Sequence, residues 1–213
     1  MMTNVLAATY PDVFKAGIVY SGVGAGCFVS ASGGVDAWNS TCSSGQSTAS
    51  AAQWAAVVHD MYPGYTGAYP RMQEYHGTAD STLNYANLAE EVKQWAGVHG
   101  YDASAPAQVL QNTPLSGYTK SIYGPNLQGI SAAGVGHTVP IQGTEDLKWF
   151  GIIGGSGTTA PTGPTTTAPG STTTAPVTTT SSAAGATQTR WGQCGGSSSA
   201  LCSRKSISAD VDA

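Results

Sequence analysis

The stretch "RMQEYHGTAD", residues 71–80, joins a strand pattern to a loop that carries a carboxylate. Residues 71–77 predict a strand, and the HGTAD loop follows at 76–80. Residues 83–99 predict a helix, because Leu83, Leu88, Val92 and Trp95 recur at the spacing of one helical face. A strand that leads through a short loop into an amphipathic helix is the repeating unit of α/β folds.

The same alternation extends in both directions along the chain. The apolar run "AGIVYSGV" (16–23) is typical of a strand that is buried on both faces. Beyond it, the patterns predict a helix over 48–62, strands over 117–124 and 126–131 around a GPN turn, and a helix over 144–153 with Thr144 as its N-cap. We therefore expect an α/β fold with a largely parallel sheet. We assign Trp149 and Phe150 to its core, with substrate binding as the alternative.

Two loops carry candidate catalytic residues. Asp80 follows the strand at 71–77, and His137, in "AAGVGHTVP" (132–140), follows the last predicted strand. Sites in open α/β sheets gather beyond the carboxyl ends of the strands. An imidazole there can relay a proton while a carboxylate fixes its tautomer. Each residue alone has a plainer explanation, as a turn former or a solvated side chain. Together, in this order, they match the acid and the base of an α/β-hydrolase triad.

The nucleophile of such a triad is missing from the printed sequence. No G-x-S-x-G motif occurs, and the near matches centre on Ser47, Ser131 and Ser198. None of these serines has the strand–turn–helix setting of a nucleophile elbow. Residues 1–10 predict a helix that has no start signal and no signal-peptide pattern. We therefore expect this helix to be the body of the nucleophile helix, severed after its elbow.

Composition excludes several classes of function. Only 9% of the 213 residues are charged, and the net charge of −4 offers no basic surface for nucleic acid. No apolar run is long enough to span a membrane. The cysteines lack the C-x-x-C spacing of zinc sites, so no metal is expected.

The four cysteines fall into two close pairs, Cys27 with Cys42 and Cys194 with Cys202. Asn39-Ser40-Thr41 is an N-glycosylation sequon beside Cys42. Paired cysteines near a sequon favour a disulfide protein of an oxidising, secretory compartment. Free buried thiols of a cytosolic protein are the alternative. We expect a Cys27–Cys42 disulfide, with Cys194–Cys202 as the weaker prediction.

The composition also divides the chain into three parts. Residues 1–154 form the α/β region. Residues 155–189 repeat a TTAP phrase, carry no charge and have little apolar area to bury, so they predict an extended linker. Thr, Ser and Pro together are also typical of O-glycosylated stalks. Residues 190–213 form a short tail with two cysteines.

Four stretches are similar to a known family. They are "MMTNVLAATYPDVFKAGIVYSGV" (1–23), "MYPGYTGAYPRMQEYHGTADSTLNY" (61–85), "EEVKQWAGVHG" (90–100) and "GISAAGVGHTVPIQGTEDLKWFGI" (129–152). They resemble the C-terminal half of fungal family 1 carbohydrate esterases, which are acetylxylan and feruloyl esterases. The resemblance implies part of an α/β-hydrolase fold, with Asp80 as triad acid and His137 as general base. It also implies that the serine elbow, the upstream strands, the oxyanion-hole loop and the signal peptide lie before Met1.

The resemblance further implies a secreted ester hydrolase that acts on acetylated or feruloylated xylan without a metal or cofactor. The tail stretch "TQTRWGQCGG" (187–196) resembles the start of a family 1 cellulose-binding module, with Trp191 as its remaining aromatic residue. After Cys202 the sequence departs from that module. Three hypotheses follow: an esterase, here without its serine and inactive; a non-catalytic cellulose-binding protein; or a secreted α/β remnant without activity.

Overall fold

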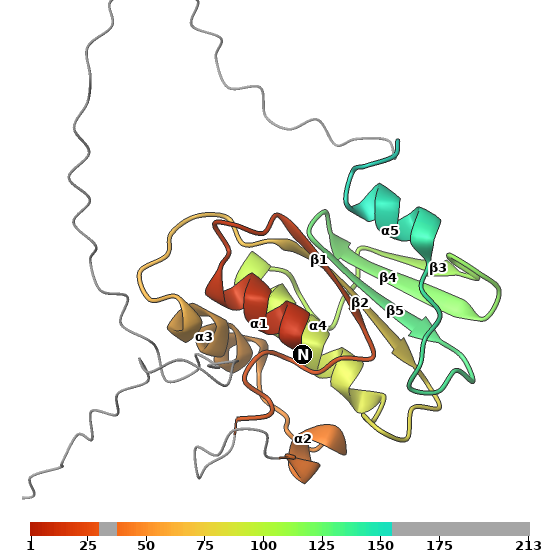
Figure 1. Cartoon of the computed structure of the whole chain (residues 1–213), viewed down its shortest axis with the longest axis horizontal. Helices are drawn as coiled ribbons and strands as arrows, with labels where there is room; N and C mark the ends of the chain where they lie inside the picture. Colours follow the sequence, from red (N-terminus) through yellow and green to blue (C-terminus); the bar gives the residue numbers. More distant parts are fainter. Residues whose placement is uncertain (30–37, 155–213) are drawn as a thin grey trace, which may run out of the picture.

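The computed structural model describes residues 1–29 and 38–154 (Figure 1). The predicted linker and tail, with Cys194, Cys202 and Trp191, lie outside the described residues. The helices are α1 (Met2–Thr9), α2 (Ser40–Ser43), α3 (Ala51–Met61), α4 (Ala86–His99) and α5 (Gly143–Trp149). The strands are β1 (Ala16–Tyr20), β2 (Arg71–Gly77), β3 (Gln108–Gln111), β4 (Tyr118–Gly124) and β5 (Leu127–Ala132).

The five strands form one mixed sheet in the order β1-β2-β5-β4-β3. Strands β1, β2 and β5 are parallel, whereas β4 pairs antiparallel with β5 and β3 antiparallel with β4. The prediction of a largely parallel sheet therefore holds only for β1, β2 and β5. The correction has a simple cause: the short GPN connection at 124–126 joins β4 to β5 as a hairpin, and a hairpin must be antiparallel.

Helices cover both faces of the sheet, and alternate strand residues point to each face. On one face, α1, α3 and α4 enclose a core that includes Val19, Met72, Trp95 and Leu127. On the other face lies a second cluster that includes Tyr75 and Ile130. Helix α5 lies on this second side (Figure 1), where the indole of Trp149 donates to the carbonyl of Gly17 at 3.1 Å.

Strand β2 lies between β1 and β5, and six of its seven residues are buried. Its buried residues include the polar side chains of Gln73, Glu74 and His76. Because successive side chains alternate, Glu74 and His76 share the face of Met72 and point toward α4. A central strand thus carries two ionisable groups into the helix-covered core, directly before the Asp80 loop.

Helices α3 and α4 pack closely at Gly97. A Cβ on Gly97 would collide with the backbone carbonyl of Ala51 and lie 3.0 Å from the Cβ of Ala55. Helix α3 itself begins with a capping box formed by Ser50 and Gln53, so Ala51 is held in a well-defined first turn. The contact therefore requires glycine at position 97.

We expect Gly97→Ala to lower the free energy of unfolding by about 1–3 kcal/mol, because the added methyl group forces two helices apart. Glycine to alanine inside a helix ordinarily stabilises, by about 0.5–1 kcal/mol. Urea denaturation followed by circular dichroism measures the sign. A stabilised variant would show that the two helices can separate freely.

The disulfide between Cys27 and Cys42 is confirmed. The side chain of Asn39 lies beside it, accepting from the backbone N–H of Cys42 at 3.0 Å and donating to the carbonyl of Cys27 at 3.2 Å. Asn39 is therefore the N-cap of α2 and links the two sides of the disulfide loop. Its glycosylation stays a prediction.

Other differences from the predicted elements are local. Helix α4 begins at Ala86, so Leu83 lies in the preceding turns, and α5 is capped at Gln142 without a side-chain bond from Thr144. Trp149 is buried as predicted, whereas Phe150 is 45% exposed, so its assignment to the core was wrong. None of the described helices has the length and apolarity needed to cross a membrane.

Candidate active site

Asp80 is held at the end of β2 by the turns that follow the strand. The backbone N–H of Asp80 donates to the carbonyl of Gly77, and one carboxylate oxygen, Oδ1, accepts from the N–H groups of Thr82 at 2.8 Å and Leu83 at 2.9 Å. The carboxylate side chain is fully buried. Burial disfavours its ionisation, but hydrogen bonds from His137 and the two backbone groups outweigh burial and hold the pKa of Asp80 below its usual value.

His137 is held by a loop that is joined to the Asp80 loop. The N–H of Thr78 donates to Ala132, the N–H of Ala79 donates to Val135, and the hydroxyl of Thr78 accepts from Gly134. These bonds fix the two loops to one another just beyond the carboxyl ends of β2 and β5. Gly77 permits the approach, because a Cβ there would collide with the carbonyls of Val135 and Gly136.

The two predicted residues are in contact. Nδ1 of His137 lies 2.9 Å from Oδ2 of Asp80. The carboxylate is only an acceptor, so Nδ1 carries a proton, and in the neutral ring the lone pair is on Nε2. The His137 side chain is 43% exposed, in contrast to the buried carboxylate. A neutral imidazole oriented by a buried carboxylate, with its second nitrogen toward solvent, can take a proton from a hydroxyl group.

Sequence analysis did not identify a second histidine beside Asp80. Nε2 of His76 lies 3.3 Å from Oδ2 of Asp80 and donates to the carbonyl of Leu83 at 2.9 Å. The available signal was the run of polar residues in the buried strand, since a histidine inside a central strand needs a partner. The carboxylate of Asp80 therefore faces two imidazole rings.

We call Asp80 and His137 the dyad. Among the described residues, no hydrogen bond joins a serine of the near-matching motifs to the dyad. Ser47 lies in the irregular segment before α3, Ser131 lies within β5, and Ser198 is outside the described residues. The structure adds Ser21, which is buried directly after β1 with a positive φ of 51°. Its hydroxyl has no hydrogen-bond partner among the described residues.

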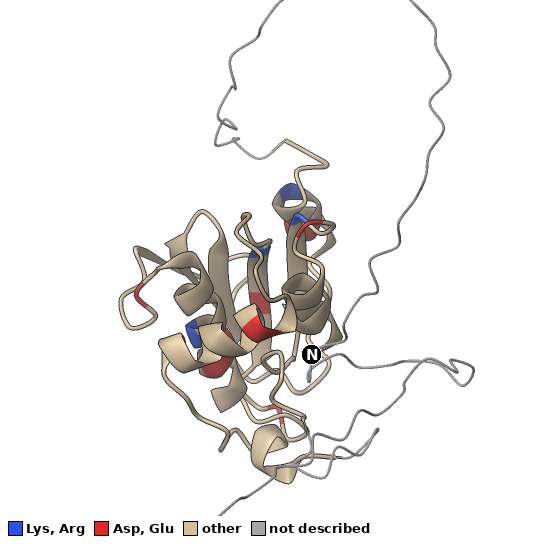
Figure 2. Cartoon of the chain, turned by 90° about the vertical axis from the view of Figure 1, so that its left-hand side faces the viewer, with Lys and Arg blue, Asp and Glu red and all other residues tan. Residues whose placement is uncertain are grey.

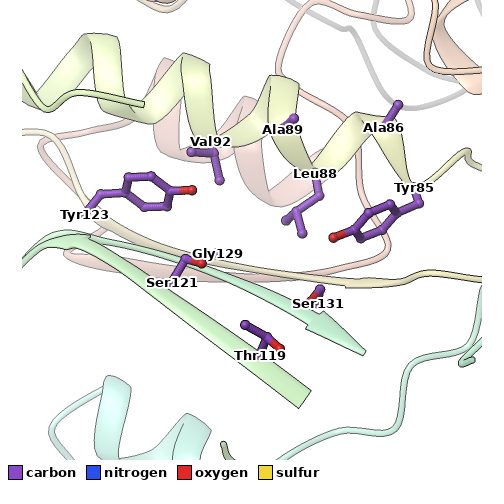
Figure 3. Close-up of a pocket in the computed structure, with 10 residues that line it drawn as sticks. All are labelled: Tyr85, Ala86, Leu88, Ala89, Val92, Thr119, Ser121, Tyr123, Gly129 and Ser131. Carbon is purple, nitrogen blue, oxygen red and sulfur yellow. The ribbon is translucent and has the colours of Figure 1, made fainter. Parts of the chain in front are cut away.

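A groove lies between α4 and the strands β4 and β5 (Figure 3). Tyr85, Leu88 and Val92 face the sheet across it, and the remaining lining residues are Ala86, Ala89, Thr119, Ser121, Tyr123, Gly129 and Ser131. Neither Asp80 nor His137 lines this groove. We therefore place the candidate active site at Asp80 and His137 and not in this groove. No group of three or more His, Cys, Asp or Glu residues that could hold a metal ion occurs in ranges 1–29 and 38–154.

Two relatives and one solved structure are similar to this chain. Acetylxylan esterase A of Talaromyces purpureogenus is 55% identical over 202 residues, which cover 92% of this chain and 53% of the relative. Acetylxylan esterase A of Aspergillus ficuum is 58% identical over 152 residues, 71% of this chain and 50% of the relative. The solved structure of an acetyl xylan esterase from Aspergillus awamori matches with a TM-score of 0.71 and 56% identity, covering 72% of this chain and 56% of that one.

The chain is a homologue of acetylxylan esterase A. It spans about half the length of these relatives. The alignment with the Talaromyces acetylxylan esterase extends beyond the α/β region, because 92% of the chain exceeds the share that residues 1–154 occupy. No family model matches the chain.

Proposed function

We propose that residues 1–154 are part of an acetylxylan esterase, a carboxylic ester hydrolase that releases acetyl groups from xylan. The observation that carries this proposal is the contact of 2.9 Å between Asp80 and His137 at the carboxyl ends of parallel strands. That geometry is the acid–base part of a serine hydrolase triad. The homology supports acetyl groups as the substrate in preference to feruloyl groups, because the relatives named above are acetylxylan esterases.

In the proposed reaction, Nε2 of His137 takes the proton of a serine hydroxyl while the serine oxygen bonds to the carbonyl carbon of the acetyl group. The ester C–O bond then breaks, and the same proton passes to the departing xylan oxygen. Water, deprotonated by His137, hydrolyses the acetyl-serine and releases acetic acid. Asp80 holds the ring and stabilises the imidazolium. The proposal requires no metal and no cofactor.

We propose that the serine and the oxyanion-hole donors belong to a segment outside residues 1–213. The printed sequence holds no G-x-S-x-G motif, and the chain covers about half of its relatives. Residues 1–213 alone are then inactive. Secretion to an extracellular, oxidising compartment agrees with the Cys27–Cys42 disulfide. The linker at 155–189 and a weak contribution of Trp191 to cellulose binding also remain proposals.

The test compares residues 1–213 with a chimera in which the N-terminal half of the Talaromyces acetylxylan esterase precedes Met1. We expect hydrolysis of p-nitrophenyl acetate and acetylated xylan by the chimera, and no hydrolysis above background by residues 1–213. Methyl ferulate serves as the control substrate for feruloyl specificity. A chimera that melts cooperatively but is inactive would contradict the assignment of the dyad.

Activity of residues 1–213 alone would contradict the external serine. Ser21, Ser47 and Ser131 would then each be replaced by alanine. Ser21 is the first choice, since it lies at the carboxyl end of β1, on the same edge of the sheet as Asp80 and His137.

A further inference from the structure

Asp80 is contacted from behind by a histidine that the proposed reaction does not use. Nε2 of His76 faces the carbonyl of Leu83 at 2.9 Å and Oδ2 of Asp80 at 3.3 Å. Both facing atoms are acceptors, so Nε2 must carry a proton. The charge of the ring then depends on whether Nδ1 also carries a proton.

A carboxyl oxygen of Glu91 faces Nδ1. Oε2 of Glu91 lies 3.9 Å from Nδ1 of His76, and both side chains are fully buried. Neither atom has a hydrogen-bond partner among the described residues. Two unpartnered polar atoms that face each other in a core carry a large cost unless they bond to one another. A proton on Nδ1 and a small movement of either side chain would satisfy both.

The other oxygen of Glu91 is already bound. Oε1 accepts from the side-chain amide of Asn4 at 2.9 Å, and Asn4 in turn accepts from the indole of Trp95 at 2.9 Å. Glu91 is thereby held in a fixed position on α4, with Oε2 directed at His76. The chain of contacts runs from the exposed ring of His137 through Asp80 and His76 to Glu91.

Few charged residues occur in the described part of the chain (Figure 2). Three further groups lie near His76 and Glu91. The carboxyl of Glu74 is buried beside Glu91. Its burial and the charge of Glu91 raise the pKa of Glu74 well above its usual value, which favours the neutral acid. The α-amino group of Met1 opposes this rise. Tyr85 places its ring edge-on to His76, with the centroids 6.1 Å apart.

We propose that His76 is a permanently protonated positioning residue, an imidazolium held between the carboxylates of Asp80 and Glu91, which anchors Asp80 and limits the basicity of His137. Its influence on the base rests on the proposed esterase function; its charge does not. In support, burial lowers the pKa of His76, but the hydrogen bond and charge of Glu91, with Leu83 and Asp80, outweigh burial and raise it.

A cation at His76 has a definite consequence for catalysis. Nε2 of His76 and Nδ1 of His137 lie within 3.3 Å of the same oxygen of Asp80. A positive charge at that distance makes protonation of His137 less favourable. We therefore expect the acid limb of the pH profile of kcat/KM to lie at lower pH than it would beside a neutral His76.

The first test reads the charge of His76 directly and needs no activity. The sample is residues 1–213, or the chimera if residues 1–213 aggregate. Nitrogen NMR of the histidine rings should show both nitrogens of His76 protonated from pH 5 to 8. The assignment uses His76→Gln, which removes the resonances. An unprotonated Nδ1 at pH 7 would overturn the proposal.

The second test uses Glu91→Gln in the active chimera. The amide keeps the bond from Asn4 but removes one of the two carboxylates that face His76, and we expect the ring to become neutral. We expect the acid limb of kcat/KM to move up by about one pH unit, with a similar shift in His76→Gln. If the charge of His76 did not change, the loss of the negative charge of Glu91 would move the acid limb to lower pH. The direction of the shift therefore shows whether His76 has lost its proton.

Three controls complete this experiment. Glu91→Gln combined with Glu74→Gln excludes transfer of the charge to the neighbouring carboxyl. His99→Gln changes a partly buried histidine at the end of α4 whose ring bonds to the carbonyl of Pro70, and it should leave the limb unchanged. His76→Gln with Glu91→Gln serves if the single variants fold poorly. An unmoved limb in all variants would overturn the influence on the base, whereas an inactive chimera would overturn the proposed function.

Discussion

His137→Ala in the chimera is expected to reduce kcat/KM for p-nitrophenyl acetate by about 10³–10⁴-fold. The reason is that His137 is the group that accepts the proton of the attacking hydroxyl in the proposed reaction. The side chain is 43% exposed, so its removal leaves no buried cavity and the fold should persist. The measurement is initial velocity against substrate concentration, with circular dichroism melting as the check on folding.

The matched control is His59→Ala. His59 lies near the end of α3 and is exposed, and its ring bonds only to the hydroxyl of Tyr69 among the described residues. This variant should retain full activity. If His137→Ala kept a tenth or more of the activity, the general base would have to be another group.

Asp80→Asn is expected to reduce kcat by about 10⁴-fold, the loss known for the same change in a serine protease triad. Oδ1 accepts from the N–H groups of Thr82 and Leu83, so the oxygen of the new amide must stay on that side. Its NH₂ group is then turned toward Nδ1 of His137 and donates to it. The proton of the imidazole must move to Nε2, and the base no longer has a lone pair directed at the hydroxyl.

The pH dependence of stability gives an independent reading of the same variant. The pKa of Asp80 is held below its usual value, so the carboxylate stabilises the fold above the unfolded pKa, and that contribution is lost as the pH falls through the folded pKa. Asp80→Asn should remove this acid-side dependence. Asp102→Asn, at an exposed aspartate in the loop after α4, should keep full activity. A fully active Asp80→Asn variant would contradict the dyad.

The local patterns of the sequence were sufficient to predict most of the strands and loops near the site. The strand predicted at 71–77 coincides with β2, and the loops with Asp80 and His137 follow β2 and β5 as predicted. Residue alternation and glycine-rich loops are local signals, and the carboxyl ends of parallel strands gather at one edge. The proximity of the two residues follows from these two facts, and the structure places them 2.9 Å apart.

Elements without a strong local pattern were missed. Strand β3 (Gln108–Gln111) is largely exposed and has little apolar alternation, and α2 has only four residues. The antiparallel direction of β4 depends on pairing with β5, which a period of two along one strand does not specify. Such features are decided by neighbours that are distant in the sequence.

The sequence by itself determined most of the alternation of strands and helices, and it placed Asp80 and His137 in two loops at one edge of the sheet. Only the tertiary structure decided what stands behind them. His76 and Glu91 are fifteen positions apart on different elements, and Asn4 is farther still. A buried polar group must find its partner wherever packing brings one within reach, because water is excluded there. That requirement acts in space, so local patterns in the sequence carry no record of it.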